Sequence, residues 1–280
     1  MLPPQTHMGA VALTVSDLSR SLAYYEQIIG LRPLRREGNT AVLGAGTAEL
    51  LTLHEQQGAQ PAPRHTGLFH FALLVPTRRD LALVLRHLAQ KGADLGASDH
   101  GVSEALYLND PDGHGIEIYR DRPRAEWPMA NGALEMVTAR LNAPAILAEI
   151  GVQDVWQGLP EGTVMGHMHL QVADIPTAEQ FYTQIIGFDP MQRYGRQASF
   201  VSAGGYHHHL GFNTWNSAGA TPPPAGSAAL NHYTIVLPDT TTRDAVVERL
   251  TAAHIPTQPH AKGLFFQDPF QIGVVLAISH

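Results

Sequence analysis

The chain contains an internal repeat, and this repeat limits the folds it can adopt more than any other feature. The segment MGAVALTVSDLSRSLAYYEQIIGLRPL matches MGHMHLQVADIPTAEQFYTQIIGFDPM in phase. Each copy opens with an alternating apolar stretch that predicts a strand. The strand runs to an aspartate that is placed to cap a following helix, and a glycine marks the end of that helix. These residues are Asp17 and Gly30 in the first copy and Asp174 and Gly187 in the second.

Two further segments follow the same plan more loosely. HFALLVPTRRDLALVLRHLAQKG begins at His70, and HYTIVLPDTTTRDAVVERLTAAH begins at His232. Both place a strand before a helix, and both close with a strand that follows an Asp-Pro turn, in LYLNDPDGHGIEIY and LFFQDPFQIGVVLAI. Each module is therefore predicted to be a strand and a helix followed by three strands. The four modules are expected at residues 8–55, 67–122, 164–215 and 228–278.

The modules group into two halves along the sequence. We expect an N-terminal half at residues 1–122, a connecting segment at 123–163 with a short helix at 143–149, and a C-terminal half at 164–280. Paired modules of this kind build a sheet-lined cup, with a pocket where two copies meet. The predicted fold class is α+β, with four βαβββ modules paired into two curved sheet cups.

Composition narrows the classes of function. The formal net charge is −7 and no basic cluster occurs, which argues against a nucleic-acid surface. No apolar run approaches the roughly 20 residues of a membrane helix, and the N-terminal residues lack a signal-peptide pattern. We therefore expect a cytoplasmic protein that binds neither nucleic acid nor membrane. Because the chain has no cysteine and 16 histidines, any metal site must use imidazole and carboxylate ligands.

The second module carries a long motif, HGVSEALYLNDPDGHGIEIY. This motif and the four-module plan resemble the vicinal-oxygen-chelate superfamily and, within it, the type I extradiol ring-cleaving dioxygenases. The resemblance covers nearly the whole chain apart from the connecting segment. One position departs from the family pattern: Ser98, where the family prefers Gly, Asn, Thr, Ile or Val. The matching positions are His100, Leu106, Tyr107, Asp110, Pro111, Gly113 and Glu117.

The motif ends in a strand that carries an acidic residue. Ile116 and Ile118 share one face of this strand, and Glu117 points to the other. A carboxylate aimed into a closing pocket is costly unless it meets a cation or a metal. One interpretation is a salt bridge with Arg120 or Arg122. The surrounding motif favours a metal ligand.

The resemblance implies two histidine ligands beside Glu117. His70 opens the first strand of the second module, where the family has a metal imidazole, although a lone histidine on an apolar strand is more often a core residue. His167 lies seven residues before Asp174, at the family's other imidazole position, and His169 is expected either to support the metal ligands without binding the metal or to pack in the core. Two histidines and one carboxylate leave three positions open, as in non-haem Fe(II) oxygenases. Fe(II) is the expected metal, and Mn(II) could fill the same ligands.

The resemblance also implies acid–base groups. In GGYHHHLGFNTW the register favours His208, while the adjacent His209 faces the opposite side, and one of them should take a proton from a substrate hydroxyl and return it. The alternative is a solvent-exposed edge strand with adventitious metal affinity. By resemblance, His100 hydrogen-bonds the oxygen-derived group and Tyr107 the substrate oxygen. The histidines expected at the surface or in turns are His65, His87, His114 and His260.

The ligands are distributed over the modules in an unusual way. In better-known family members the full site lies in the C-terminal pair of modules, but here Val275 occupies the glutamate position of the fourth module and Ala10 a ligand position of the first. We therefore expect the working cup to be assembled from the second and third modules, within one chain or between two, and the latter would make a homodimer natural. The competing pair of modules three and four would offer His167, His209 and His232 without a carboxylate.

The leading hypothesis is an extradiol dioxygenase that cleaves a small catechol-like aromatic diol with O2. A glyoxalase-like isomerase or lyase is the alternative; such sites favour four protein ligands and Zn or Ni, with His209 as the fourth ligand. The His100 and Tyr107 pair argues against it. A third hypothesis is a non-catalytic protein that binds aromatic ligands on the same scaffold.

Overall fold

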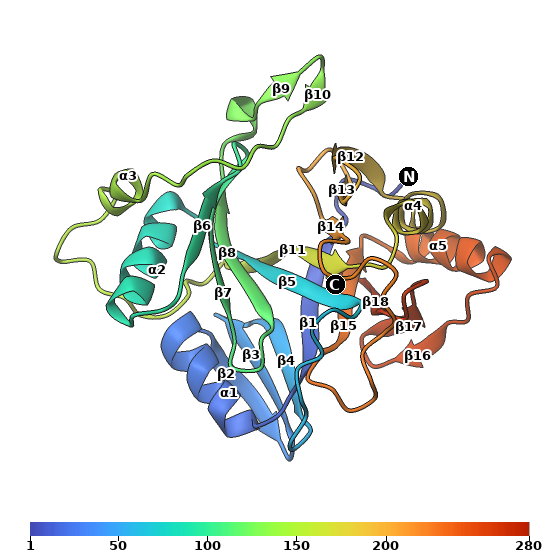
Figure 1. Cartoon of the computed structure of the whole chain (residues 1–280), viewed down its shortest axis with the longest axis horizontal. Helices are drawn as coiled ribbons and strands as arrows, with labels where there is room; N and C mark the ends of the chain where they lie inside the picture. The colour runs from blue at the N-terminus through green and yellow to red at the C-terminus, as the bar shows by residue number, and fades with distance from the viewer. Residues whose placement is uncertain (280) are drawn as a thin grey trace. The chain divides into compact units, whose positions relative to one another are not determined.

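The computed structural model describes residues 1–279, and all four modules have the predicted order of elements (Figure 1). Modules one and three both insert a π-helical turn, η1 or η3, after the helix. Module one contains β1 (His7–Val15), α1 (Leu18–Tyr24), η1 (Tyr25–Ile29), β2 (Arg32–Glu37), β3 (Thr40–Ala45) and β4 (Ala48–Glu55). Module three contains β11 (Val164–Gln171), α4 (Ile175–Gln180), η3 (Phe181–Ile186), β12 (Asp189–Tyr194), β13 (Ala198–Ser202) and β14 (Leu210–Asn213).

Modules two and four have one longer helix each and no π-helical turn. Module two contains β5 (Gly67–Leu74), α2 (Arg78–Gln90), β6 (Gly96–Asp99), β7 (Ser103–Asn109) and β8 (Gly115–Asp121). Module four contains β15 (Leu230–Leu237), α5 (Thr240–Ala252), β16 (Gln258–His260), β17 (Gly263–Gln267) and β18 (Gly273–Ile278). The connecting segment contains η2 (Arg124–Glu126), the hairpin β9 (Met129–Ala130) and β10 (Ala133–Leu134), and α3 (Ala143–Leu147).

The modules form two curved eight-stranded sheets. Hydrogen bonding gives one the order β16-β17-β18-β15-β1-β4-β3-β2 and the other the order β12-β13-β14-β11-β5-β8-β7-β6. The strands of modules two and three therefore belong to one sheet of a single chain, and those of modules one and four to the other. The predicted α+β class with paired βαβββ modules is confirmed.

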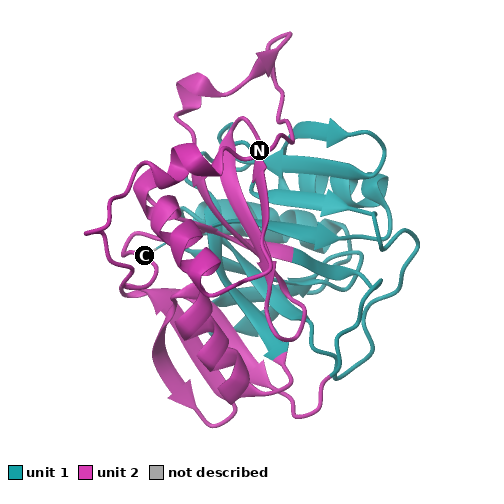
Figure 2. Cartoon of the chain, turned by 60° about the vertical axis from the view of Figure 1, so that its left-hand side comes forward, with its two compact units in different colours: residues 1–14, 60–69, 166–280 teal, residues 15–59, 70–165 magenta. Residues whose placement is uncertain are grey.

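The chain divides into two compact units (Figure 2). One unit comprises Met1–Thr14, Gln60–Phe69 and Gly166–His280, and the other comprises Val15–Ala59 and His70–Met165. In the second unit, β7 lies between β6 and β8, and the hairpin β9–β10 projects away from these strands (Figure 1). Among residues 1–279, no helix is long and apolar enough to cross a membrane.

The helix boundaries of modules one and three follow from the predicted caps. The Asp17 side chain accepts a hydrogen bond from the Arg20 N–H, and Asp174 accepts one from the Thr177 N–H. The π-helical turns end at glycines with left-handed φ angles, 88° at Gly30 and 104° at Gly187. The caps and stops were visible in the sequence, but the change from α to π hydrogen bonding was not.

A buried aspartate holds the turn before the last strand of module two. The Asp110 carboxylate accepts hydrogen bonds from the N–H groups of Asp112 and His114, and it also accepts one from the Tyr25 hydroxyl at 2.9 Å. In module four, Asp268 accepts hydrogen bonds from two backbone N–H groups and from the Tyr182 hydroxyl, also at 2.9 Å. These turns fix where β8 and β18 begin, and so which residues each strand presents.

Candidate metal centre

Strand register brings the acidic residue of the motif beside the first histidine of its module. β5 and β8 pair in parallel with Ala72 opposite Glu117, so that His70 lies near the start of this pairing. Both side chains are buried, and His70 Nε2 lies 2.9 Å from Glu117 Oε2. The neighbours of Glu117 on β8, Ile116 and Ile118, are fully buried. The alternation predicted from GIEIY therefore holds, and Glu117 faces a histidine.

The salt-bridge alternative for Glu117 is wrong. Arg120 Nη2 lies 2.6 Å from the Glu104 carboxylate, and Arg122 Nη2 lies 2.7 Å from Asp99. Burial raises the pKa of Glu104, but hydrogen bonds from Arg78 and Arg120 outweigh this effect and hold its pKa below the usual range. Both arginines named in that alternative are thus paired with other carboxylates.

Three predicted ligands come together in the structure. His70, Glu117 and His167 each offer one ligand atom, and these atoms all lie within 4.8 Å of one another. All three residues are buried, and theirs is the only such group of His, Asp and Glu side chains among residues 1–279. Two imidazoles and one carboxylate suit a divalent transition metal and leave three positions of an octahedral ion open. The donor set therefore fits the expected metal.

The tyrosine and histidine of the motif form a hydrogen-bonded pair next to Glu117. Tyr107 on β7 is directly opposite Glu117 on β8 in the antiparallel register. His100 Nε2 lies 2.7 Å from the Tyr107 hydroxyl oxygen, and the His70 and Tyr107 rings have centroids 5.6 Å apart. Burial raises the pKa of Tyr107 well above its ordinary value, and the Glu117 carboxylate raises it further. The phenol therefore keeps its proton at neutral pH.

The histidine run of module three is buried. His207, His208 and His209 are each at most 9% exposed, so the alternative of a solvent-exposed edge strand is wrong. The His208 ring lies against His167, with centroids 4.1 Å apart. His207 Nδ1 lies 2.8 Å from His208 Nδ1, a contact for which the sequence carries no signal. The histidine favoured by register is thus the one beside a predicted ligand.

His209 contacts the backbone and the aromatic rings around it. Its Nδ1 accepts a hydrogen bond from the Ala203 N–H at 3.1 Å, and its ring lies near those of Phe188 and Tyr206. Burial lowers the pKa of His209 to about 3, with a further contribution from His207. His209 is therefore a neutral imidazole at physiological pH, and its Nδ1 lone pair is already engaged.

The remaining histidines divide into packed and peripheral ones. His169 lies among Phe69, Phe200 and Trp215, in keeping with a packing role. The prediction of a surface or turn position is wrong for His87, which lies within α2 and is less than 10% exposed. His114 is also buried.

Each of these two histidines has a defined partner. The His87 ring on α2 stacks on Trp156 of the connecting segment, with centroids 4.5 Å apart. His114 does lie in a turn, but its Nδ1 is 2.8 Å from Asp110. Composition alone could not predict either partner, because Trp156 lies 69 residues after His87 and Asp110 contacts His114 only through the fold of a tight turn.

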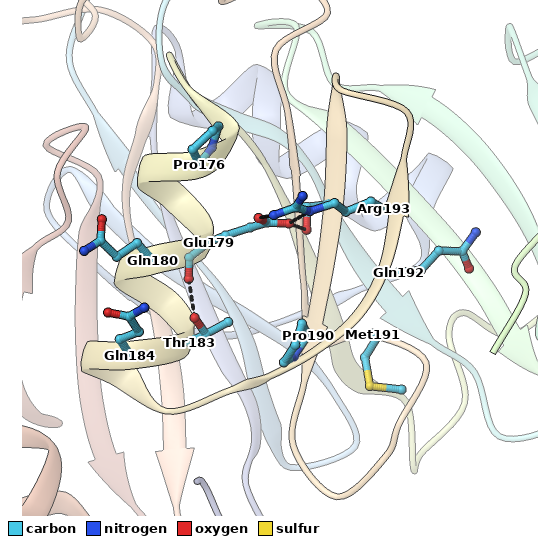
Figure 3. Close-up of a pocket in the computed structure, with 10 residues that line it drawn as sticks. Pro176, Glu179, Gln180, Thr183, Gln184, Pro190, Met191, Gln192 and Arg193 are labelled. Atoms are coloured by element: carbon cyan, nitrogen blue, oxygen red, sulfur yellow. Dashed lines mark hydrogen bonds and ion pairs between the residues drawn. The ribbon is translucent and has the colours of Figure 1, made fainter. Parts of the chain in front are cut away.

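A separate groove lies between α4–η3 and β12 and contains none of the predicted site residues. Its volume is about 630 Å³, and it is lined mainly by polar side chains. Figure 3 shows the side chains of Glu179 and Arg193 meeting across it, and the Glu179 carboxylate also accepts a hydrogen bond from the Ser199 hydroxyl at 2.5 Å. An ion pair is therefore part of the lining of this groove.

The fold and the buried His–Glu–His group define the class of protein. The chain belongs to the Glyoxalase/Bleomycin resistance protein/Dioxygenase superfamily, whose family model matches residues 7–118 and 164–276. It is 42% identical over 269 residues to the catechol-2,3-dioxygenase of Bacillus subtilis (strain 168), and the match covers 94% of both chains.

Solved structures agree on the fold. A presumed dioxygenase from Bacillus subtilis subsp. subtilis str. 168 superposes with a TM-score of 0.66 at 14% identity, over 99% of this chain and 86% of the other. Glyoxalase I from Zea mays superposes with a TM-score of 0.58 at 17% identity, over 97% and 92% of the two chains. At these identities the likeness concerns the fold alone, since this fold carries several kinds of chemistry.

Proposed function

We propose that the chain is an extradiol ring-cleaving dioxygenase that inserts O2 next to the vicinal hydroxyls of a catechol-like aromatic. The single observation that carries this proposal is the 42% identity to a catechol-2,3-dioxygenase over 94% of both chains. The grouping of His70, Glu117 and His167 supports it from the structure. Both atoms of O2 enter the product, so the reaction needs no external reductant.

The proposed metal ligands are His70, Glu117 and His167, with Fe(II) as the metal and Mn(II) as the alternative. When bound, Fe(II) would supply the redox chemistry with O2 and open positions for the two adjacent oxygens of the diol. Carboxylate and neutral imidazole ligands must be deprotonated to bind, so metal affinity should fall in acid. The 2.9 Å contact between His70 and Glu117 holds the two ligands together on neighbouring strands.

His208 is the proposed acid–base group. It lies against His167, whereas the His209 lone pair at Nδ1 accepts the Ala203 N–H. An imidazole beside a metal ligand can take the proton of a substrate hydroxyl and later return it to the ring-opened product. Tyr107 and His100 lie next to Glu117, and His100 Nε2 is 2.7 Å from the Tyr107 hydroxyl oxygen. We assign this pair to hydrogen-bonding an oxygen of the substrate or of O2.

His209 as a fourth ligand would support the glyoxalase-like alternative. Because His209 Nδ1 accepts the Ala203 N–H, the structure gives that alternative no support. The cytoplasmic location and the homodimer remain predictions from the sequence. Modules two and three share a sheet within one chain, so their pairing needs no second copy of the chain.

The proposed function is tested by purifying the protein without oxygen, measuring its metal content, loading it with Fe(II) and adding catechol. We expect oxygen uptake together with a yellow ring-opened product. Glu117→Gln should abolish both, because an amide is a poor ligand for the metal, and the matched variant Glu248→Gln, on the exposed face of α5, should leave both unchanged. Tight stoichiometric Zn or Ni without oxygen uptake would contradict the proposal and favour the isomerase class.

A further inference from the structure

The connecting segment reaches the His100–Tyr107 pair, although the family motif does not include it. His100 Nδ1 lies 2.8 Å from the Val137 carbonyl oxygen. A carbonyl oxygen can only accept, so the ring proton must lie on Nδ1. In the neutral ring Nε2 then keeps its lone pair and lies 2.7 Å from the Tyr107 hydroxyl oxygen, whose single proton is shared between this lone pair and the Glu117 carboxylate. One backbone carbonyl thereby determines which ring nitrogen faces the proposed site.

The contact is part of a short stretch of strand pairing. The Val137 N–H donates to the His100 carbonyl at 3.1 Å. Two residues further on, Asp99 and Ala139 exchange both backbone hydrogen bonds at 2.9 Å, as an antiparallel bridge. β6 is an edge strand of its sheet, so residues 137–139 add to it where it ends. We call residues 137–139 the strap.

Side chains of the connecting segment also pack closely against the turn that carries His100 and Gly101. Gly101 has a φ of +74°, and a Cβ there would lie 2.8 Å from Pro128 and 3.4 Å from Val137. The Asp99 carboxylate accepts hydrogen bonds from the Gly101 N–H and from Arg122. The turn that carries His100 is therefore held between a carboxylate on one side and the connecting segment on the other.

Both flanks of the strap are anchored to the same unit, which a positioning role requires. Before the strap, the Trp127 indole N–H donates to the Arg122 carbonyl at 2.9 Å. After it, Leu141 is buried, and Arg78 donates to the Ala145 carbonyl at 3.0 Å. The Val137 carbonyl is thus fixed in space rather than carried on a free loop.

We propose that the strap is a positioning element of the ring-cleavage site, in which the Val137 carbonyl holds His100 in the Nδ1–H tautomer and turns its Nε2 toward Tyr107. This inference rests on the proposed dioxygenase function for its kinetic consequences, but the tautomer itself does not depend on that function. Val137 acts through His100 and is a positioning residue, not a catalytic one.

The variant that tests the strap is Ala139→Pro, and Val152→Pro, outside the strap in the same connecting segment, is its matched control. Proline at 139 removes the N–H that donates to Asp99, which breaks the pairing without changing any side chain near His100. Val152 is fully exposed in a turn that the Asp154 N–H closes onto the Gly151 carbonyl at 3.2 Å, and proline is favoured at this second position of a turn. We expect Ala139→Pro to lower kcat about tenfold with KM for catechol unchanged, and Val152→Pro to leave kcat within about twofold.

A double-mutant cycle separates positioning from general loss of structure. In a His100→Gln background, Ala139→Pro should cause no further loss of kcat, because the residue through which the strap acts is already gone. An equal additional loss in that background would overturn the proposal.

The second readout needs no activity. Nitrogen NMR of 15N-histidine-labelled, metal-free full-length protein distinguishes a protonated from an unprotonated ring nitrogen, and the His100 signals are those absent from His100→Gln. We expect wild-type His100 to carry its proton on Nδ1, and Ala139→Pro to show a mixture of tautomers. A wild-type ring protonated only on Nε2 would overturn the proposal even if oxygen uptake is normal. Absence of oxygen uptake with the expected tautomer would refute the dioxygenase function and leave the strap intact.

Discussion

Modules two and four share one construction and differ in what it presents. Each carries a histidine in the first half of its first strand, His70 in β5 or His232 in β15, and each holds the turn before its last strand with a buried aspartate. In module two, β7 and β8 then place Tyr107 opposite Glu117. The matching pair on β17 and β18 of module four is Phe265 opposite Val275.

The two modules differ in side chains and not in the scaffold. Module four keeps the strands, the turn and the histidine, but its two facing positions have an apolar side chain in place of a carboxylate and a phenyl ring in place of a phenol. Val275 is fully buried, so the space that a carboxylate would need is filled by apolar packing. In the proposed function, the chemistry therefore depends on a few side chains on an otherwise repeated frame.

The largest expected effect comes from the two matching histidines. His70→Ala should lower oxygen uptake with catechol by more than about a hundredfold and lower the bound Fe(II), because even the outer partners of metal ligands are worth about 10–100-fold. His232→Ala, which removes a ring packed against His260, should leave both within about twofold. Equal losses in the two variants, measured with an oxygen electrode and by metal analysis, would remove the distinction between the modules.

The second comparison concerns the glycines that end the helices of modules one and three. Gly30→Ala places a Cβ 2.4 Å from Trp156 and 2.9 Å from backbone atoms of Gly158 and Leu159. We expect a loss of about 3–4 kcal/mol in the free energy of unfolding, from the left-handed φ and from backbone that cannot move aside. Gly187→Ala should cost only about 1–2 kcal/mol, because its closest neighbour at 3.1 Å is the end of the flexible Arg249 side chain. Urea unfolding of both variants measures the difference, and equal losses would mean that the Trp156 contact is not rigid.

The third comparison concerns pH and the aspartate of module four. Burial raises the pKa of Asp268 to about 6, against about 3.9 for an unfolded aspartate. The folded protein therefore binds more protons than the unfolded chain between these values, and stability should fall as the pH rises from about 4 to about 6, by up to about 3 kcal/mol. Asp268→Asn cannot ionise and should lose this part of the pH dependence. Parallel stability–pH curves for the variant and the wild type would rule out Asp268 as its source.

The sequence predicted the frame well because the frame is built from local signals. The repeat, the aspartate caps and the glycine stops each depend on residues a few positions apart. The pairing of modules two and three was predicted from the positions of the candidate ligands, because Ala10 in module one and Val275 in module four occupy positions where a ligand would be needed. Glu117 was predicted as a metal ligand from the motif, and His70 and His167 from the positions that the family resemblance implies; the structure brings these three side chains together.

What the sequence could not predict depends on contacts between distant segments. The His87 ring is buried by Trp156, and His100 is oriented by the Val137 carbonyl, which lies 37 positions away. A backbone carbonyl has no sequence signature, so no motif could reveal the second contact. The orientation of His209 toward Ala203 depends in the same way on how the loop between β13 and β14 folds back.

The strap has a consequence for solubility as well. β2, the outer strand of its own sheet, is exposed throughout and carries Pro33 and four charged residues, a composition that discourages pairing with strands of other molecules. β6 has the sequence GASD and lacks such protection. Residues 137–139 pair with the end of this edge strand and so satisfy backbone groups that another chain could otherwise bind. Loss of the strap would therefore favour self-association at high protein concentration.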